Sequence, residues 1–236
     1  MKIALIGYGK MGREVERLAL EAGDQIVSKF DLDPLPDARG LQKAEVCIEF
    51  STPETVMENM KLAADSGVDI VVGTTGWYDH LEEVRSWFTG SALVYAQNFS
   101  IGVNAFYRIL ERAAQLMESL PEYDVFVEER HHRGKVDSPS GTALRISEIL
   151  LKEIERKTRT VEGTPPGGIG EEALQISSLR AGTMAGTHIV GFDSAGDMIE
   201  LRHTAKNRMG FAMGALRAAR WVRGKKGVFT MDDVDI

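Results

Sequence analysis

Residues 128–143, with the sequence EERHHRGKVDSPSGTA, gather the side chains of this chain that are best suited to chemistry. They include two adjacent histidines, His131 and His132, and a lysine, Lys135. An imidazole titrates at about pH 6.5, and a lysine whose pKa is lowered by burial or neighbouring positive charge can act as a general acid. The Ser-Gly-Thr turn at 140–142 is predicted to open a helix, whose unpaired N–H groups attract a carboxylate or phosphate. Together these groups suit an anionic, especially a dianionic, substrate and a proton transfer.

A strand must position the histidines, and a turn must position the lysine. Successive strand residues point to opposite faces, so His131 and His132 can enter one pocket only where the strand ends. Arg133 and Gly134 predict that end, and Lys135 follows the turn. A solvated basic turn followed by an ordinary capped helix would also account for the pattern.

Three other chemistries fit this stretch less well. A phosphate-binding loop needs a serine or threonine where Val136 stands, and an upstream glycine that is missing. A zinc site would lack a suitably spaced third ligand. A serine hydrolase would carry the pattern G-x-S-x-G, whereas Pro139 precedes Ser140.

The N-terminal residues follow the order strand, glycine-rich turn, helix, which is typical of dinucleotide binding. The apolar run 2–6 leads into GYGKMG, with glycines at Gly7, Gly9 and Gly12. The first permits a tight turn, the second lets the backbone approach a pyrophosphate, and the third allows close helix–strand packing. Asp31 ends the next strand nineteen residues after Gly12, where an acidic residue would bind the ribose hydroxyls. A tight turn and an ordinary surface aspartate are the plainer alternative.

Strands and helices alternate through about residue 100, which predicts a parallel, doubly wound sheet with ligands at the carboxyl ends of its strands. Within this region, residues 32–44 are expected to form an irregular connection. The helix that follows the third strand is expected to have Thr52 as N-cap and Pro53 at its first position. The loops expected at the ligand edge of the sheet are those at Gly7, Asp31, Gly73 and Gln97.

The pattern changes beyond residue 100. Tyr123–Arg130 alternates between apolar and polar residues, as a half-exposed strand of the antiparallel type does. We expect helices at 140–157 and 209–222, and a Gly/Pro-rich loop at 158–172. Further antiparallel strands are expected at 174–180, 187–192 and 198–204, and the tail 224–236 is acidic at its end. The predicted fold is α/β: an N-terminal doubly wound Rossmann domain, and an α+β C-terminal domain with a mixed or antiparallel sheet.

Composition excludes several classes of protein. The 236 residues carry a net charge of -7, with 35 acidic against 28 basic side chains, so a nucleic-acid partner is not expected. The single cysteine, Cys47, rules out a disulfide framework. No apolar run approaches the ~20 residues of a membrane span, and no signal-peptide pattern opens the chain. We therefore expect a cytoplasmic protein without a membrane partner.

The sequence resembles the dihydrodipicolinate reductase family, over essentially the whole chain. The most specific motif is HHRGKVDSPSGTA at 131–143. The segments GTTG at 73–76, QNFS at 97–100 and NRM at 207–209 resemble further landmarks of the family, in the same order. The resemblance implies that a reduced nicotinamide gives hydride to a cyclic imine dicarboxylate in diaminopimelate and lysine biosynthesis.

The resemblance also implies roles for individual residues. His131 and Lys135 look like the catalytic proton-transfer groups, and no metal site is implied. The substrate contacts it implies are His132, Ser140, Gly141, Thr142 and Arg208. The contacts it implies for NADH or NADPH are Gly7, Tyr8, Gly9, Lys10, Met11, Gly12, Asp31, Gly73, Thr74, Thr75, Ala96, Gln97, Asn98 and Phe99.

Family members are typically homotetramers assembled through the C-terminal sheet. Their last helix returns to the nucleotide domain, so the domains are expected at 1–100 with 208–236 for the dinucleotide, and at 101–207 for substrate binding and oligomerisation. The first loop is one residue shorter than the commoner family form, and Lys10 stands where arginine is frequent. Asp31 favours NADH because a carboxylate repels a 2′-phosphate, although Lys10 or Lys29 could offset that repulsion. A related amino-acid dehydrogenase and a non-catalytic dinucleotide sensor are the alternative functions.

Overall fold

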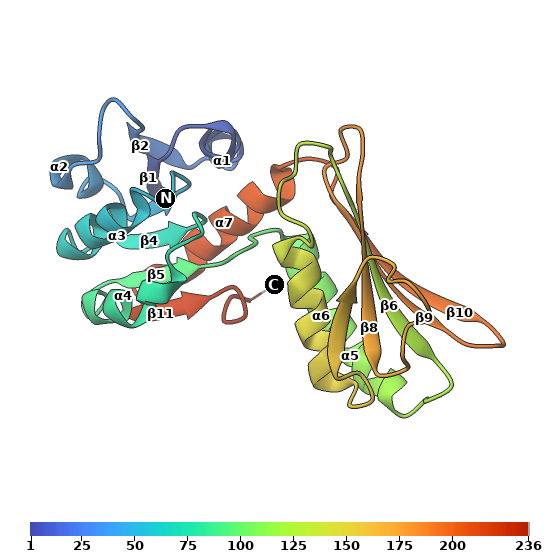
Figure 1. Cartoon of the computed structure of the whole chain (residues 1–236). Helices are drawn as coiled ribbons and strands as arrows, with labels where there is room; N and C mark the ends of the chain where they lie inside the picture. Colours follow the sequence, from blue (N-terminus) through green and yellow to red (C-terminus); the bar gives the residue numbers. More distant parts are fainter. Residues whose placement is uncertain (236) are drawn as a thin grey trace. The chain divides into compact units, whose positions relative to one another are not determined.

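The computed structural model describes residues 1–235 and divides into two compact units (Figure 1). Unit 1 comprises Met1–Asn104 together with the segment that begins at Arg208, and unit 2 comprises Ala105–Asn207. Each unit has its own sheet and its own hydrophobic core.

Unit 1 is built on a six-stranded sheet in the order β11-β5-β4-β3-β1-β2. Every neighbouring pair in this sheet is parallel. Its elements are β1 (Lys2–Ile6), α1 (Lys10–Glu21), β2 (Gln25–Phe30), α2 (Ala38–Leu41), β3 (Val46–Glu49), α3 (Val56–Asp65), β4 (Asp69–Val72), η1 (Tyr78–His80), α4 (Leu81–Trp87), β5 (Ala92–Tyr95), α7 (Met209–Val222) and β11 (Gly227–Thr230).

Helices cover both faces of this sheet. Ile3 and Leu5 of β1 pack with residues of α1 and α7 in one core cluster, whereas Ala4 and Ile6 pack with residues of α2, α3 and α4 in the other. Strands that are buried on both faces, such as β3, carry near-continuous apolar runs because no side needs to face water. The predicted doubly wound Rossmann domain is confirmed.

Two local expectations in unit 1 were wrong, and one strand was not foreseen. Helix α3 begins at Val56 with Thr55 as N-cap, because Pro53 lies in a turn that the Thr52 carbonyl closes by accepting the Val56 N–H. The supposed connection 32–44 contains α2, whose N-cap Asp37 accepts a 2.6 Å hydrogen bond from Gly40 N–H. The unforeseen strand is β11 in the tail, which extends the sheet by pairing with β5.

Unit 2 is built on a five-stranded sheet in the order β10-β9-β6-β8-β7. Strands β10, β9 and β6 pair antiparallel, whereas β6, β8 and β7 pair parallel. The elements beyond β5 are α5 (Ile101–Glu118), whose first turn belongs to unit 1, then β6 (Asp124–His131), α6 (Gly141–Glu153), β7 (Arg159–Glu162), β8 (Ala173–Arg180), β9 (Thr187–Asp193) and β10 (Met198–Thr204).

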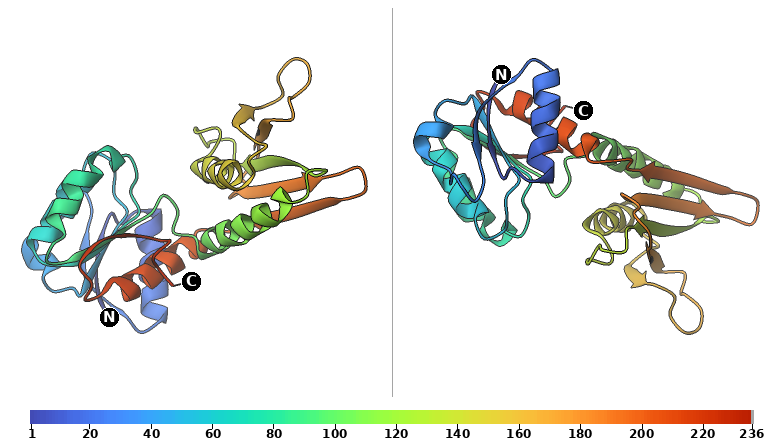
Figure 2. Two further views of the ribbon diagram at one scale, coloured as in Figure 1. Left: turned by 90° about the horizontal axis from the view of Figure 1, so that it is seen from below. Right: turned by 90° about the horizontal axis from the view of Figure 1, so that it is seen from above.

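The mixed sheet is confirmed, and two details of the prediction were wrong. Strand β8 is parallel to β6 rather than antiparallel, because the intervening chain crosses over through α6. The segment 158–172 is not all loop, since its first part forms β7. Figure 2 shows the rest of that segment projecting from the body of unit 2.

One face of the unit 2 sheet packs on α5 and α6 and turns polar at one end. Val125 and Val127 of β6 share a core cluster with both helices. Because side chains alternate along a strand, Glu129 and His131 continue on the same face, and both are buried. The end of β6 therefore carries two ionisable groups into the space next to the start of α6.

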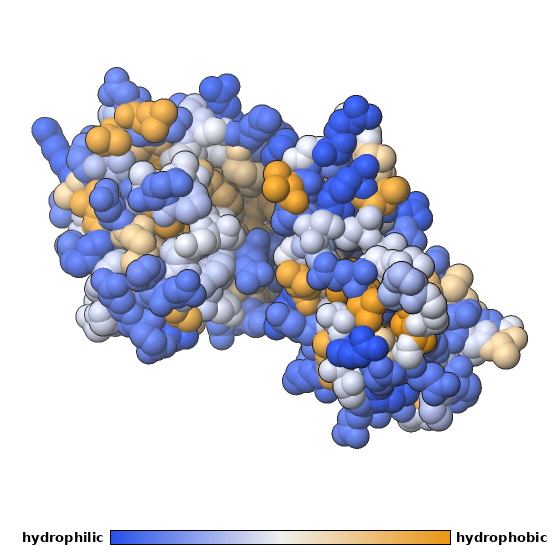
Figure 3. Space-filling model, in the orientation of Figure 1, coloured by the Kyte–Doolittle hydropathy of each residue, from blue (hydrophilic) through white to orange (hydrophobic). Residues whose placement is uncertain are grey.

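No helix within residues 1–235 combines the length and apolar character that crossing a lipid bilayer requires. Figure 3 shows a surface on which hydrophilic side chains predominate and apolar ones form small, separate groups.

Candidate active site

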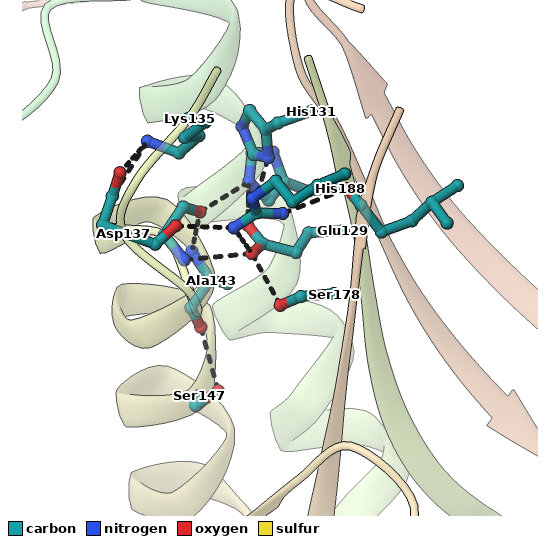
Figure 4. A network of polar contacts seen from close by, with 11 residues as sticks. Glu129, His131, Lys135, Asp137, Ala143, Ser147, Ser178 and His188 are labelled. Carbon is teal, nitrogen blue, oxygen red and sulfur yellow. Dashed lines mark hydrogen bonds and ion pairs between the residues drawn. The ribbon is translucent and has the colours of Figure 1, made fainter. Parts of the chain in front are cut away.

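The polar cluster of unit 2 is centred on Glu129, which is fully buried (Figure 4). Its Oε1 accepts three hydrogen bonds: from Ser140 N–H at 3.0 Å, from Ser178 Oγ at 2.7 Å and from Arg180 Nη2 at 2.7 Å. The donors come from the start of α6 and from β8, the neighbour of β6. One carboxylate oxygen of β6 is thus hydrogen-bonded to both α6 and β8.

The other carboxylate oxygen faces two imidazoles. Oε2 of Glu129 lies 3.4 Å from His131 Nδ1 and 3.5 Å from His188 Nε2. The two rings stand edge to face with their centroids 5.1 Å apart. His188 Nε2 also lies 3.2 Å from Ser140 Oγ. His188 comes from β9, where it pairs in register with Glu129.

Burial and hydrogen bonding set the charges in this cluster. Burial alone would raise the pKa of Glu129, but the nearby His188 side chain and hydrogen bonds from Ser140, Arg180 and Ser178 outweigh it and hold the pKa well below its usual range. Burial lowers the pKa of His131 to about 4, although the Glu129 charge opposes the shift. At neutral pH the cluster therefore holds a carboxylate beside a neutral His131.

Lys135 follows a tight turn in which its N–H donates to the His132 carbonyl at 3.1 Å. Its ammonium lies 2.7 and 2.8 Å from the two carboxylate oxygens of Asp137. Burial raises the pKa of Asp137, and the hydrogen bond and charge of Lys135, together with the Gly141 N–H, lower it below its usual value. A carboxylate thus already sits between the Lys135 ammonium and the start of α6, the two features expected to attract an anionic substrate.

Helix α6 begins as predicted, with Ser140 as its N-cap. The Ser140 hydroxyl accepts a hydrogen bond from Ala143 N–H at 3.2 Å. The Ser140 N–H is already used by Glu129. A carboxylate bound at this helix end would therefore depend on N–H groups beyond Ser140, and the nearest of them, that of Gly141, already interacts with Asp137.

The expectation that a third metal ligand is lacking was wrong. Glu129, His131 and His188 each offer a ligand atom, and these atoms lie within 4.8 Å of one another. The third group comes from a strand far along the chain, so local spacing could not reveal it. We assign no metal here, because the Arg180 guanidinium lies 2.7 Å from the same carboxylate and would repel a cation.

The glycines of unit 1 have the geometry that a dinucleotide-binding turn needs. Gly7 has φ of +82°, and a Cβ on it would lie 2.2 Å from the Phe50 carbonyl oxygen. A Cβ on Gly12 would lie 2.3 Å from the Gly7 oxygen, so helix and turn touch there. Gly9 has open space around it and caps α1 without a side chain. No side chain of the N-cap residue therefore occupies the start of α1, and a helix start of this kind suits a pyrophosphate.

The other predicted dinucleotide residues gather at the same edge of the unit 1 sheet. Asp31 is exposed and directly follows Phe30, whose carbonyl accepts the Gly7 N–H at 2.9 Å. Gly73 N–H donates to the Glu49 carbonyl, and segments 73–75 and 96–99 follow β4 and β5. The Phe99 side chain is buried in the core, so a cofactor could meet only its backbone.

Tyr8, Lys10 and Met11 lie around the start of α1. The Tyr8 hydroxyl donates to Glu16, and the Lys29 ammonium sits 4.8 Å from the centre of the Tyr8 ring. Lys10 is exposed, and Met11 packs partly against the core.

The structure does not place all predicted substrate residues in one unit. Lys135, Ser140 and His131 belong to unit 2, and His132 is exposed just beyond the end of β6. Arg208 belongs to unit 1, where it is exposed at the N-cap of α7.

The sequence interpretation missed four members of the cluster: Glu129, Ser178, Arg180 and His188. The alternation that placed Val125 and Val127 inward extends to Glu129, so its burial could have been inferred. The other three lie on strands paired with β6 over long sequence distances, and no local signal identifies them.

Unit 1 has a parallel sheet whose first turn is rich in glycine, and unit 2 gathers buried histidines, a carboxylate and a lysine. This combination is that of a dinucleotide-dependent oxidoreductase. The family models described as dihydrodipicolinate reductase, N-terminus, and dihydrodipicolinate reductase, C-terminus, match residues 1–99 and 102–234. The chain belongs to the dihydrodipicolinate reductase family, which confirms the resemblance of its motifs.

Individual proteins agree with this assignment. The 4-hydroxy-tetrahydrodipicolinate reductase of Christiangramia forsetii is 38% identical over 236 residues, covering 99% of this chain and 97% of the relative. The protein of the same name from Archaeoglobus fulgidus is 37% identical over 260 residues, covering 99% of both. The dipicolinate-bound dihydrodipicolinate reductase from Paenisporosarcina sp. TG-14 has the same fold, with a TM-score of 0.81, 22% identity and 99% coverage of both chains.

Proposed function

We propose that this chain catalyses the reduction of 4-hydroxy-tetrahydrodipicolinate to tetrahydrodipicolinate, with NADH or NADPH as the hydride donor. The observation that carries the proposal is the match to the family over both halves of the chain. The product belongs to diaminopimelate and lysine biosynthesis. When bound, the reduced nicotinamide supplies the hydride, and the protein positions the reactants and supplies the proton.

The two units divide the work in this proposal. Unit 1 holds the dinucleotide at the carboxyl edge of its sheet, with the pyrophosphate at the start of α1 and the adenosine ribose at Asp31. Unit 2 holds the substrate between Lys135 and the start of α6, where Asp137 now occupies the position next to the ammonium. His132 and Arg208 contribute further substrate contacts.

Lys135 is the proton donor in this proposal. In this proposal the 4-hydroxyl group of the substrate leaves as water, which gives the unsaturated cyclic imine dicarboxylate that accepts the hydride. Hydride addition then leaves negative charge on the nitrogen and adjacent carbon, and a proton must neutralise it. His131 has its pKa lowered to about 4 by burial, so it carries no spare proton at neutral pH. The side chain of Lys135 retains 23% of its exposure and forms an ion pair with Asp137, as a charged ammonium does.

The test is to follow NADH and NADPH oxidation spectroscopically with freshly generated 4-hydroxy-tetrahydrodipicolinate. We expect substrate-dependent oxidation of the dinucleotide and formation of tetrahydrodipicolinate. Higher efficiency on other imine or amino-acid substrates would instead favour a related dehydrogenase, and binding without turnover would favour a sensor.

We further propose that NADH is the preferred donor. Asp31 is exposed where a 2′-phosphate would lie, and it would repel that group. Lys29 cannot readily offset this repulsion, because its ammonium lies 2.9 Å from Glu16 Oε1. Lys10 is exposed at the start of α1, and it is the remaining cation of the two that could offset Asp31.

Replacing Asp31 with serine is therefore expected to raise the kcat/KM ratio of NADPH to NADH by about tenfold. Steady-state kinetics with both dinucleotides measure the ratio. Asp33→Ser is the matched control, since Asp33 is also exposed but lies two residues further into the loop. An unchanged ratio of kcat/KM in Asp31→Ser would show that Asp31 does not contact the adenosine ribose.

A homotetramer assembled through the unit 2 sheet is the proposed assembly. The face of this sheet opposite α5 and α6 carries exposed apolar side chains, including Leu179 (49% exposed) and Met198 (51%). Light scattering is expected to give four times the chain mass of 26.0 kDa. Leu179→Glu should reduce that mass, whereas Leu116→Glu on α5 should not. A monomer in the unmodified protein would contradict the proposal.

A further inference from the structure

We infer that Glu129 is a positioning residue that fixes which ring nitrogen of His131 carries the hydrogen and joins that ring to the start of α6. This inference rests on the proposed function, because it concerns the histidine placed in the substrate site. It follows from how the two oxygens of one buried carboxylate are occupied.

The three donors at Oε1 leave Oε2 as the oxygen that faces the histidines. Ser140 N–H, Ser178 Oγ and Arg180 Nη2 all point at Oε1, at 3.0, 2.7 and 2.7 Å. Oε2 and His131 Nδ1 are both buried, and among residues 1–235 neither meets a polar atom with the distance and angle of an ordinary hydrogen bond. They lie 3.4 Å apart, slightly closer than Oε2 and His188 Nε2 at 3.5 Å.

An ionised carboxylate can only accept, and a neutral imidazole has one N–H and one lone pair. If the lone pair of His131 faced Oε2, two electron-rich atoms would meet in a site closed to water. The low pKa of Glu129 keeps the carboxylate charged, so the hydrogen of His131 belongs on Nδ1. The separation is longer than an ordinary hydrogen bond, and catalytic contacts commonly tighten when substrate binds.

The other charged and titratable groups around His131 do not offer a competing acceptor at Nδ1. Arg180 on β8 and Lys135 in the turn are cations, and both lower the pKa of His131. His188 on β9 directs its Nε2 at Oε2 and at Ser140 Oγ. His203 on β10 is the register partner of His188, so His188 and its strand β9 lie between His203 and Glu129.

The consequence is that Nε2 of His131 keeps the lone pair. A Cβ built on Gly186 would lie 3.0 Å from this atom, so the backbone there approaches it closely and φ is +148°. His131 is therefore set to accept a hydrogen bond or a proton through Nε2, whereas Lys135 donates. Glu129 also holds Ser140 N–H, so the same side chain aligns this ring with the helix end that faces the substrate.

Glu129→Gln tests the inference because the direction of its amide can be foreseen. The three donors at Oε1 require the carbonyl oxygen at that position, which puts the NH2 group at the position of Oε2. An NH2 group donates, so His131 Nδ1 must become the lone-pair atom and Nε2 must take the hydrogen. The side-chain shape is unchanged, and the hydrogen changes place.

The measurement is the ring-nitrogen spectrum of His131 in 15N-labelled protein with the dinucleotide bound, assigned by its loss in His131→Asn. We expect Nδ1 to be the protonated nitrogen in the unmodified protein and Nε2 in Glu129→Gln. Turnover in Glu129→Gln should fall on the order of 100-fold, with NADH affinity unchanged. Glu128→Gln is the control, because Glu128 points to the opposite face of β6 and is paired with Arg130.

If the spectrum of the unmodified protein shows the hydrogen of His131 on Nε2, the inference is overturned. This outcome does not depend on whether Glu129→Gln folds. Lost turnover with an unmoved hydrogen would mean a merely structural role and would also overturn it. Ser178→Ala, which removes one donor and keeps the charge, should leave the hydrogen on Nδ1. If the unmodified protein shows the expected spectrum but does not reduce 4-hydroxy-tetrahydrodipicolinate, the proposed function fails and the positioning of His131 stands.

Discussion

Replacing Lys135 with methionine is expected to lower turnover by about 100- to 10,000-fold while leaving the affinity for NADH unchanged. Methionine keeps the length of the side chain and removes the ammonium, which is the proton source in the proposed reaction. The dinucleotide contacts that we propose all lie in unit 1, so dinucleotide binding should not respond. Steady-state kinetics give turnover, and fluorescence titration of NADH gives the affinity.

Lys135→Arg separates charge from proton transfer. Arginine keeps a cation beside Asp137 and does not release a proton at ordinary pH. It should therefore retain much of the substrate affinity and still lose turnover. Lys152→Met is the control, because Lys152 is 70% exposed and paired with Glu153 on the same helix, α6, at its far end. Full turnover in Lys135→Met would exclude Lys135 as the donor.

The candidate site was predictable where its parts are close in sequence. His131, Lys135 and Ser140 lie within ten residues, and a strand end, a turn and a helix cap are each readable locally. The contacts that set their properties come from β8 and β9, through Arg180 and His188. Which strand pairs with which is a long-range outcome of packing, so neither residue could be assigned to the site from its neighbours in sequence.

The fold was predictable where an element is long or buried on a regular face. Helix α7 has the predicted bounds, Met209–Val222, because its apolar spacing runs over several turns. The four-residue strands β7 and β11 were missed, since RTVE and GVFT are too short to show a period. They are strands because the edges of β8 and β5 supply hydrogen-bond partners.

Replacing Gly214 with alanine is expected to destabilise unit 1 by about 3 kcal/mol, at the upper end of the usual overpacking cost. Gly214 lies in the middle of α7, and a Cβ there would stand 1.7 Å from the Phe99 carbonyl oxygen. In an unobstructed helix the change would stabilise by about 1 kcal/mol. The clash outweighs that gain because the obstacle is backbone and cannot rotate away.

The same clash should reach the dinucleotide site. Phe99 is buried and belongs to the segment 96–99 that we place against the cofactor, so a displaced α7 moves that segment with it. Thermal unfolding should shift down by roughly 6–12 °C, and NADH should bind more weakly. Gly210→Ala is the control in the same helix, because its Cβ would meet only the rotatable Ser100 hydroxyl, at 3.3 Å. Equal stability of the two variants would show that α7 does not pack closely against the Phe99 carbonyl at Gly214.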